Sequence, residues 1–344
     1  MPQTRRIPLA LLCLITAFAS AFAQETLKVD TTLVSVPVIV SDRQGRYVGE
    51  LKEKDFSLFQ DGNKQPISFF AATEEPFNVA LLLDTSHSTF AVINDIKHSA
   101  KDFVKRLRAQ DRAMIVTFDH EIRVLTELTS DHHGLEKAIE SAEIGERAGT
   151  VLRDAIDNVI EKNLKPIKGR KAIVLLTDGK DHGSYISERD LLDQTAEAEV
   201  LIYPIFFQNF PPMAQNRAPR MGRGGFGGIG MGRRGGIMLP RAPRPNQERK
   251  REERRQKIEQ RNESVIDYLV ELAEGSAGRF YRSDVADLKK TFAQIADELR
   301  HQYRLGFYPP DEPEAGKLHT LKVAVAKSDV VVRARRNYRL EQKK

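Results

Sequence analysis

The sequence predicts an α/β fold in which an open, mostly parallel sheet with helices on both faces is inserted between two halves of a small antiparallel β domain. Between residues 76 and 300, short apolar runs alternate with amphipathic stretches, the pattern of a parallel sheet covered on both faces. The flanks, 24–75 and 301–340, show the period-two alternation of antiparallel strands. The simplest arrangement pairs the two flanks into one sandwich-like domain.

The first 23 residues are typical of a secretory signal peptide. Two arginines precede an apolar stretch at 7–18, and an Ala-Phe-Ala cleavage site ends at Ala23. The apolar stretch is short for a bilayer crossing, which needs about 18 to 20 residues. We therefore expect a protein that is secreted, or held in the periplasm or cell envelope, after cleavage between Ala23 and Gln24. An uncleaved N-terminal anchor is the alternative.

Cysteine usage and charge narrow the class of protein. Cys13 is the only cysteine and lies inside the signal, so the mature chain would have no disulfide, thiolate metal site or cysteine nucleophile. The formal net charge is +6, but residues 210–263 alone carry fourteen Lys and Arg against five Asp and Glu. The rest of the mature chain is therefore mildly acidic, and the basic character belongs to one segment.

Alternating apolar residues mark the strands of the two flanks. In the N-terminal flank, Val34, Val36, Val38 and Val40 alternate with other residues, which indicates a strand with one buried face. Further strands are expected at 55–60, 66–70, 303–308, 321–325 and 330–338. Turns are expected at 42–45, 61–62 and 328–329. The Asp61-Gly62 pair supplies the positive φ angles that a tight hairpin needs.

The α/β region contains an orderly succession of strands and helices. Strands are expected at 78–84, 113–118, 171–178, 200–207 and 278–281. Helices are expected at 91–109, 134–142, 151–163, 188–198, 265–273 and 285–300. The strands are nearly continuous apolar runs, and the helices carry apolar residues at three- and four-residue steps.

Residues 209–262 interrupt this pattern with a segment rich in Gly, Pro and Arg. Such a segment cannot bury enough apolar surface to order itself, so we expect it to be mostly disordered, with a helix at 247–260. A glycine pattern at 222–227 fits a dinucleotide-binding loop, but no strand precedes it and no helix follows it. We expect a solvated linker or, alternatively, weak contact with anionic surfaces, and no nucleic-acid partner.

Three loops carry the residues that could bind a ligand. Asp84, Ser86 and Ser88 follow the first strand, Thr150 precedes a helix in a Gly-Thr turn, and Asp178 follows the third strand in a Thr-Asp-Gly turn. Because ligands of open parallel sheets bind at the carboxyl ends of the strands, we expect these loops to converge. Their oxygens suit a hard divalent cation such as Mg²⁺. With only two carboxylates, the ion would remain electrophilic toward an acidic group of a partner.

This three-part pattern resembles the adhesion-site signature of the von Willebrand factor A family, and the flanks are similar to those of bacterial secreted proteins that carry this domain. The resemblance implies a Rossmann-like fold and a metal-ion-dependent adhesion site (MIDAS) occupied by Mg²⁺ or Mn²⁺. It implies that Asp84, Ser86, Ser88 and Thr150 coordinate the ion, directly or through water, and that Asp178 acts largely through water. The implied function is adhesion to a protein or matrix ligand that presents a carboxylate, without catalytic residues.

Other interpretations of these residues stay open at this point. Asp84 and Ser86 could cap the helix that follows them. A metal-dependent hydrolase would need a general base, for which His87 and Asp181 are the candidates by position. A structural envelope protein could use the metal for stability alone. The pairs Asp181-His182 and His132-His133 could suggest metal or catalytic work, but we expect them to be solvated loop residues.

Overall fold

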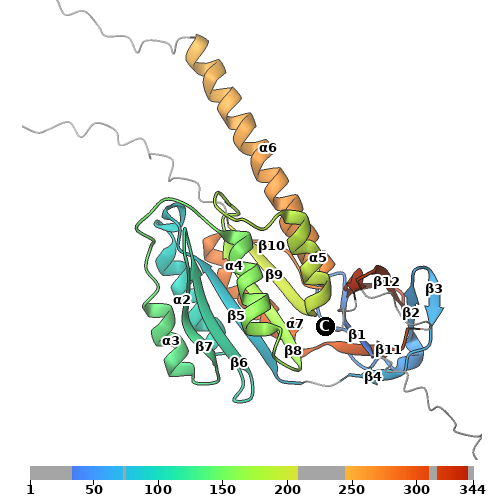
Figure 1. Ribbon diagram of the computed structural model, residues 1–344. Helices are drawn as coiled ribbons and strands as arrows, with labels where there is room; N and C mark the ends of the chain where they lie inside the picture. The colour runs from blue at the N-terminus through green and yellow to red at the C-terminus, as the bar shows by residue number, and fades with distance from the viewer. Residues whose placement is uncertain (1–32, 73–74, 208–244, 310–315, 340–344) are drawn as a thin grey trace, which may run out of the picture. The chain divides into compact units, whose positions relative to one another are not determined.

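A six-stranded sheet forms the centre of the α/β region (Figure 1). The computed structural model describes residues 33–72, 75–207, 245–309 and 316–339. The strands lie in the order β10-β9-β8-β5-β6-β7, and neighbours are parallel except for β6 and β7. Their bounds are β5 (Phe77–Asp84), β6 (Arg112–Phe118), β7 (Ile122–Thr129), β8 (Arg170–Thr177), β9 (Val200–Phe206) and β10 (Tyr281–Arg282). The fold class predicted from the sequence is confirmed.

The central strands are apolar along their length because both faces of the sheet are covered. Every residue of β5 and of β9 is buried. Side chains of β5 alternate between two cores, with Leu81 and Leu83 in one and Ala80 and Leu82 in the other.

Helices form a layer on each face of this sheet. The core that contains Leu81 is closed by α2 (Ile93–Val104), α3 (His132–Glu140) and α7 (Leu288–Arg300). The core that contains Leu82 is closed by α4 (Leu152–Asn158), α5 (Glu188–Ala198) and α6 (Pro245–Gly275). Among the residues that the structure describes, no helix has the length and apolar content needed to span a membrane.

The sequence pattern does not predict β7, which closes the sheet at one edge. Three residues separate β7 from β6, so the two strands form an antiparallel hairpin. The pairing contains two register shifts, and bulges of this kind break the period-two alternation that identifies a strand. The side chains of β7 are also mostly only partly buried, which weakens its apolar signal.

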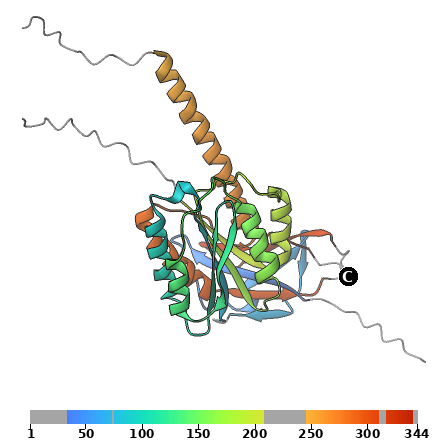
Figure 2. The ribbon, with the colours of Figure 1, turned by 60° about the vertical axis from the view of Figure 1, so that its left-hand side comes forward.

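The helix α6 contains the helix expected at 247–260 and joins it to the next expected helix. Its first half consists of charged helix-forming residues and continues without a break into the expected helix at 265–273. The apolar residues Leu269 and Leu272 pack in the core and anchor the helix, and no Gly or Pro separates them from the charged half. Figures 1 and 2 show the amino-terminal turns of α6 extending past the carboxyl edge of the sheet. The glycine pattern and the basic tract at 209–244 lie outside the described residues, as does the expected signal peptide.

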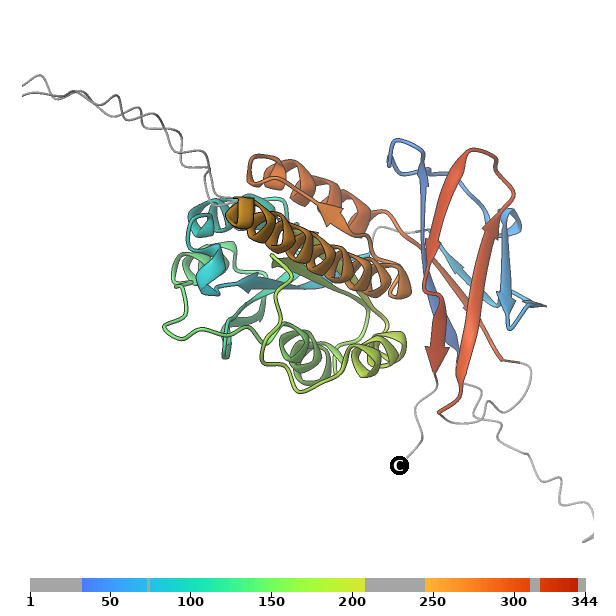
Figure 3. The same cartoon turned by 90° about the horizontal axis from the view of Figure 1, so that it is seen from above.

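The two flanks of the chain share two four-stranded antiparallel sheets, and Figure 3 shows N-terminal and C-terminal strands side by side. One sheet has the order β13-β1-β11-β4 and the other β14-β12-β2-β3. The N-terminal strands are β1 (Val34–Asp42), β2 (Phe56–Gln60), β3 (Asn63–Gln65) and β4 (Phe69–Ala71). The C-terminal strands are β11 (Tyr303–Phe307), β12 (Leu318–Val325), β13 (Val330–Ala334) and β14 (Asn337–Arg339). The expected pairing of the flanks is confirmed.

The core of this sandwich contains the alternating residues that the sequence singles out. Val34, Val36, Val38 and Val40 are all buried in it. The β2–β3 hairpin turns at Asp61 and Gly62, whose φ angles of 48° and 82° are those of the expected tight turn. The expected single strand at 330–338 is instead divided, because β13 pairs with β1 in one sheet and β14 with β12 in the other.

A buried ion-pair network joins the sandwich to α7. The Arg333 side chain, from β13, places Nη2 at 2.8 Å from Oε2 of Glu298 on α7. Glu298 also accepts hydrogen bonds from Arg279 and from the Tyr281 hydroxyl. Since Glu298 is buried, these partners compensate a charge that would be costly if left alone.

Truncation after Arg300 is expected to cause aggregation. It removes β11, which pairs with both β1 and β4, and β12, which pairs with β2, so the remaining strands keep unpaired edges and an uncovered apolar face. Size-exclusion chromatography of the truncated mature chain measures this, and truncation after Arg339 is the control expected to stay monodisperse. A monodisperse, folded product ending at Arg300 would contradict the shared sandwich.

Candidate functional site

Two acidic residues meet at the carboxyl edge of the sheet. Asp84 ends β5 and Asp178 follows β8, and these strands are parallel neighbours with Leu83 paired to Leu176. Asp84 is fully buried and Asp178 is 8% exposed. The continuous apolar runs before each acid place both carboxylates at this edge, as the sequence predicts.

The turn after Asp84 is fixed by hydrogen bonds. Oδ1 of Asp84 accepts the backbone N–H of Ser86 at 3.0 Å, and Oδ2 accepts the Thr177 hydroxyl at 2.8 Å. The hydroxyl oxygens of Ser86 and Ser88 lie 3.0 Å apart. The Thr89 hydroxyl donates to the Ser86 carbonyl at 2.8 Å, which holds the end of the turn. Asp84, Ser86 and Ser88 thus present their oxygens from one ordered turn.

The helix-capping interpretation of Asp84 and Ser86 is wrong. The helix that follows is α2, which begins at Ile93 with Val92 as its N-cap residue. Ser86 does precede a short 3-10 turn at His87–Thr89, but its side chain makes no capping hydrogen bond there. The acceptor oxygens of Asp84 bind within the turn and to the neighbouring strand end, not to the first turn of α2.

Thr150 lies at the same edge of the sheet. Hydrogen bonds of Thr150 and of the adjacent Val151 connect its loop to the other two loops of the site. The N–H of Val151 donates to the Asp119 carbonyl at 2.8 Å, and the Asp119 carboxylate accepts the hydroxyl of Thr85 at 3.0 Å. The Thr150 carbonyl accepts the N–H of His182 at 3.0 Å. The loops that contain Thr150, Asp84 and Asp178 are therefore linked to one another.

Asp119 is a buried acid that the sequence analysis missed. It follows β6 as Asp84 follows β5, so its position after an apolar strand was the available signal. Its carboxylate is fully buried, pairs with Arg123, and lies 2.7 Å from Nδ1 of His120. With these partners and Thr85 around it, Asp119 holds the site loops together.

Lys180 is a second residue that the sequence analysis missed. Its Nζ lies 2.5 Å from Oδ2 of Asp178, and its backbone N–H donates to Oδ1 of the same carboxylate at 3.3 Å. The Lys180 side chain is about half exposed, so the ammonium group can leave this position at modest cost. A cation bound beside Asp178 would compete with this ammonium group.

Burial raises the pKa of Asp84 from 3.8 to about 6, and the charge of Asp178 adds to the rise. Hydrogen bonds from Ser86 and Thr177 act in the opposite direction without offsetting it. The ionised form of Asp84 is therefore disfavoured in the protein alone. A divalent cation between the two carboxylates would instead favour the ionised form of Asp84.

Residues 78–215 match the sequence model of the von Willebrand factor type A (VWA) domain. The chain carries a VWA domain. This match and the architecture of the sheet confirm the family resemblance of the α/β region.

Similar proteins give further comparisons. An uncharacterized protein of Synechocystis sp., sll0103, is 31% identical over 113 residues, which cover 31% of this chain and 26% of that protein. The chain thus matches about a quarter of the length of this relative.

Among solved structures, proximal thread matrix protein 1 from the mussel byssus is 15% identical, with a TM-score of 0.46, over 75% of this chain and 50% of that one. BatB from Bacteroides thetaiotaomicron is 17% identical, with a TM-score of 0.43, over 64% and 98%. A further structure of the mussel protein is described as having a zinc-occupied MIDAS motif, with 16% identity, a TM-score of 0.46 and coverage of 70% and 49%.

The donor set at the edge of the VWA sheet fits a hard cation. It combines carboxylates with hydroxyls, which are the ligand types that Mg²⁺ accepts while keeping bound water. Within the described ranges, no three His, Cys, Asp or Glu side chains form a cluster that could hold a metal. The candidate donor set combines the carboxylates of Asp84 and Asp178 with the hydroxyls of Ser86 and Ser88.

The other polar loop residues take several different positions. Asp181 is not the solvated residue expected from sequence, because its carboxylate accepts the N–H groups of Arg153 at 3.0 Å and Ser184 at 3.1 Å and anchors the loop to α4. His182 is exposed, with Nε2 at 3.2 Å from Nη2 of Arg261 on α6. His87 is also exposed. His132 and His133 are the first two residues of α3 rather than loop residues.

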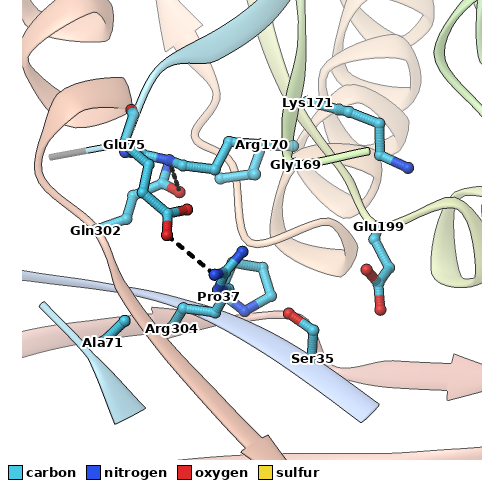
Figure 4. Close-up of a pocket in the computed structure, with 11 residues that line it drawn as sticks. Ser35, Pro37, Ala71, Glu75, Gly169, Arg170, Lys171, Glu199, Gln302 and Arg304 are labelled. Carbon is cyan, nitrogen blue, oxygen red and sulfur yellow. Dashed lines mark hydrogen bonds and ion pairs between the residues drawn. The ribbon is translucent and has the colours of Figure 1, made fainter. Parts of the chain in front are cut away.

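A cavity lies at the opposite end of β8 from Asp178 (Figure 4). Arg170, the first residue of β8, donates hydrogen bonds there to the Glu75 carbonyl at 2.8 Å and to Oε1 of Gln302 at 3.2 Å. Arg304 forms an ion pair with Glu75 at 3.0 Å. These charged groups are occupied in joining β8 to β11 and to the segment before β5, so we assign the cavity a structural role.

Replacing Asp84 with Asn is expected to stabilise the metal-free protein at neutral pH. Above pH 6 the folded wild type must keep an ionised carboxylate buried, at a cost of roughly 3 kcal/mol for a pKa raised by about two units. Below about pH 3 the carboxyl is protonated in both the folded and the unfolded state, so the difference between the two proteins should vanish. Urea unfolding in EDTA across this pH range measures the effect.

The exposed acid Glu146, in the loop before Thr150, provides the control for this experiment. Glu146→Gln should leave the pH dependence of unfolding as in the wild type. An Asp84→Asn variant that is less stable than the wild type at pH 7.5 without metal would contradict the buried charge at Asp84.

If a divalent cation binds beside Asp178, replacing Lys180 with Met is expected to tighten its binding, with Mg²⁺ as the probe. The substitution removes the ammonium group that pairs with Asp178. A half-exposed ion pair of this kind is worth at most about 1 kcal/mol, so the Kd for Mg²⁺ should fall by about two- to fivefold. Isothermal titration calorimetry measures this, with Lys168→Met as the control because it removes the same charge just before β8, at the opposite edge of the sheet. Equal or weaker affinity in Lys180→Met would show that the lysine does not compete.

Proposed function

We propose that this chain is an exported, non-enzymatic adhesion protein that uses Mg²⁺ or Mn²⁺ to engage a carboxylate on a protein or matrix partner. The main support is the ordered turn in which Asp84, Ser86 and Ser88 present their oxygens beside Asp178, at the carboxyl edge of a VWA sheet. Thr150 completes the proposed ligand set from the loop before α4.

The charge balance of the proposed site favours a partner carboxylate. Two carboxylates and three neutral hydroxyls surround a doubly charged ion, and one of the carboxylates, Asp178, is shared with Lys180. When bound, the ion supplies Lewis acidity toward an incoming carboxylate oxygen. Asp84, Ser86, Ser88 and Thr150 would hold the ion directly or through water, and Asp178 would act largely through water, so the hydroxyls would add ligands without adding charge.

The hydrolase alternative lacks a suitable base among the residues considered for that role. Asp181 is engaged by Arg153 and by backbone N–H groups, so its carboxylate oxygens already have partners that anchor the loop. His87 is exposed to water, and a hydrolytic site needs a base within reach of a bound water in an excluded pocket. These positions favour binding over hydrolysis.

Export follows from the N-terminal segment in this proposal. Residues 1–23 have the composition of a cleavable signal, and the remaining chain has no cysteine that an oxidising compartment would modify. A partner would then be met outside the cytoplasm, in the envelope or the surrounding matrix.

Chelation is expected to lower the melting temperature of the mature protein. Binding to the native state alone stabilises it by about 2.7 kcal/mol when the free ion is in hundredfold excess over its Kd. Melting curves in EDTA, Mg²⁺ and Mn²⁺ measure this. Asp84→Ala should abolish the response to metal, whereas Glu53→Ala, which removes an exposed acid of the sandwich, should retain it. A wild-type curve that ignores EDTA and both ions, with no binding by calorimetry, would overturn the proposal.

A further inference from the structure

Two exposed aromatic side chains flank the proposed metal site. Phe90 is 73% exposed and Tyr185 is 97% exposed. The other exposed large hydrophobic side chains of the described residues lie between 37% and 46%. The two largest exposures both belong to the segments that follow β5 and β8, the strands that lead to Asp84 and Asp178. Single exposed hydrophobic residues are ordinary, but two such rings at one site indicate a contact surface.

The backbone that carries Phe90 is part of the ordered turn of the site. Phe90 lies two residues after Ser88, and the residue between them, Thr89, is buried and hydrogen-bonded to the Ser86 carbonyl. The N–H of Phe90 donates to the His87 carbonyl at 3.4 Å. The ring thus projects into solvent from a fixed backbone.

The backbone that carries Tyr185 is equally well held. Its N–H donates to both carboxylate oxygens of Asp154, at 2.9 and 3.0 Å. The same loop is anchored by Asp181 and by the hydrogen bond from His182 to the Thr150 carbonyl. An almost fully exposed ring adds almost nothing to the stability of the fold. Aromatic side chains on a fixed backbone contribute strongly to binding free energy when a partner buries them.

The two rings lie toward opposite faces of the sheet. Phe90 leads into α2, which belongs to the layer that covers Leu81. Tyr185 lies between α4 and α5, which belong to the layer that covers Leu82. Asp84 and Asp178 end strands of the sheet between these layers, so the proposed metal ion would have one aromatic ring toward each side.

We propose that Phe90 and Tyr185 contact the residues on either side of the metal-binding carboxylate, and that the partner is a polypeptide segment in which one Asp or Glu is flanked by apolar side chains. This inference rests on the proposed function of the metal site. It adds that binding specificity comes from the two rings, since the metal alone would accept any carboxylate.

The charges near the site favour a polypeptide over an acidic polysaccharide. Gly145 donates its N–H to the Thr85 carbonyl at 2.9 Å, which brings the exposed acids Glu143 and Glu146 close to the site. These acids repel a chain with repeated carboxylates, whereas one carboxylate bound to the metal and flanked by apolar groups avoids that repulsion.

Selection from a random peptide display library tests the inference. The immobilised mature protein is panned in Mg²⁺, and bound peptides are eluted with EDTA and sequenced. Wild-type protein should enrich peptides with one Asp or Glu flanked by apolar residues. Asp84→Asn should give no EDTA-eluted enrichment. The double variant Phe90→Ser and Tyr185→Ser should still enrich acidic peptides but lose the preference for apolar neighbours.

Affinity for one selected synthetic peptide, measured by fluorescence polarisation, gives the second readout. The double variant should bind at least tenfold more weakly, with unchanged Mg²⁺ affinity by calorimetry. Tyr308→Ser, which removes an exposed ring just after β11, is the matched control and should bind as the wild type does.

The possible failures have different meanings. Acidic peptides without apolar neighbours, or equal peptide affinity in the double variant, would overturn the role of the two rings and leave the proposed metal site standing. Absence of any EDTA-eluted enrichment on wild-type protein, together with no Mg²⁺ or Mn²⁺ binding by calorimetry, would overturn both proposals. Mg²⁺-dependent binding to polygalacturonate without peptide enrichment would replace the polypeptide partner by an acidic polysaccharide.

Discussion

The burial of Asp84 at the end of β5 is the constraint on which the site depends. A fully buried carboxylate beside Asp178 is unfavourable when ionised, as the rise of its pKa to about 6 reflects. The hydrogen bonds from Ser86 and Thr177 reduce this cost only in part, and Lys180 neutralises Asp178 rather than Asp84. A cation between the two carboxylates would compensate both negative charges. The hydroxyls of the surrounding residues would then serve as its ligands, a role that folding alone does not require.

The rest of the fold supports this edge of the sheet. β8 leads to Asp178 at its carboxyl end, and its first residue, Arg170, hydrogen-bonds to Glu75 and Gln302 at its amino end. The chain continues from α7 into β11, so the helix layer and the sandwich share a short connection as well as the ion pair of Glu298 with Arg333. The sandwich thereby fixes the amino end of the same strand that presents Asp178.

Much of this could be predicted from the sequence, because the strongest signals are local. The apolar run before Asp84 gives a buried strand, and the alternating valines of β1 give a half-buried one. What could not be predicted depends on pairing and on distant partners. The bulged pairing of β7 removes its alternation, and nothing in the order of residues indicates that Asp181 would meet Arg153 or that Lys180 would fold back on Asp178.

Anomalous scattering from crystals grown with Mn²⁺ tests the central claim most directly. The account predicts one strong peak at the carboxyl edge of the sheet, with the hydroxyl oxygens of Ser86 and Ser88 within roughly 2.5 Å of the ion and Asp84 nearby, bound directly or through water. It also predicts that the Lys180 ammonium group has moved away from Asp178. Crystals that diffract well and show no Mn²⁺ at this edge, or show it only at another site, would contradict the account.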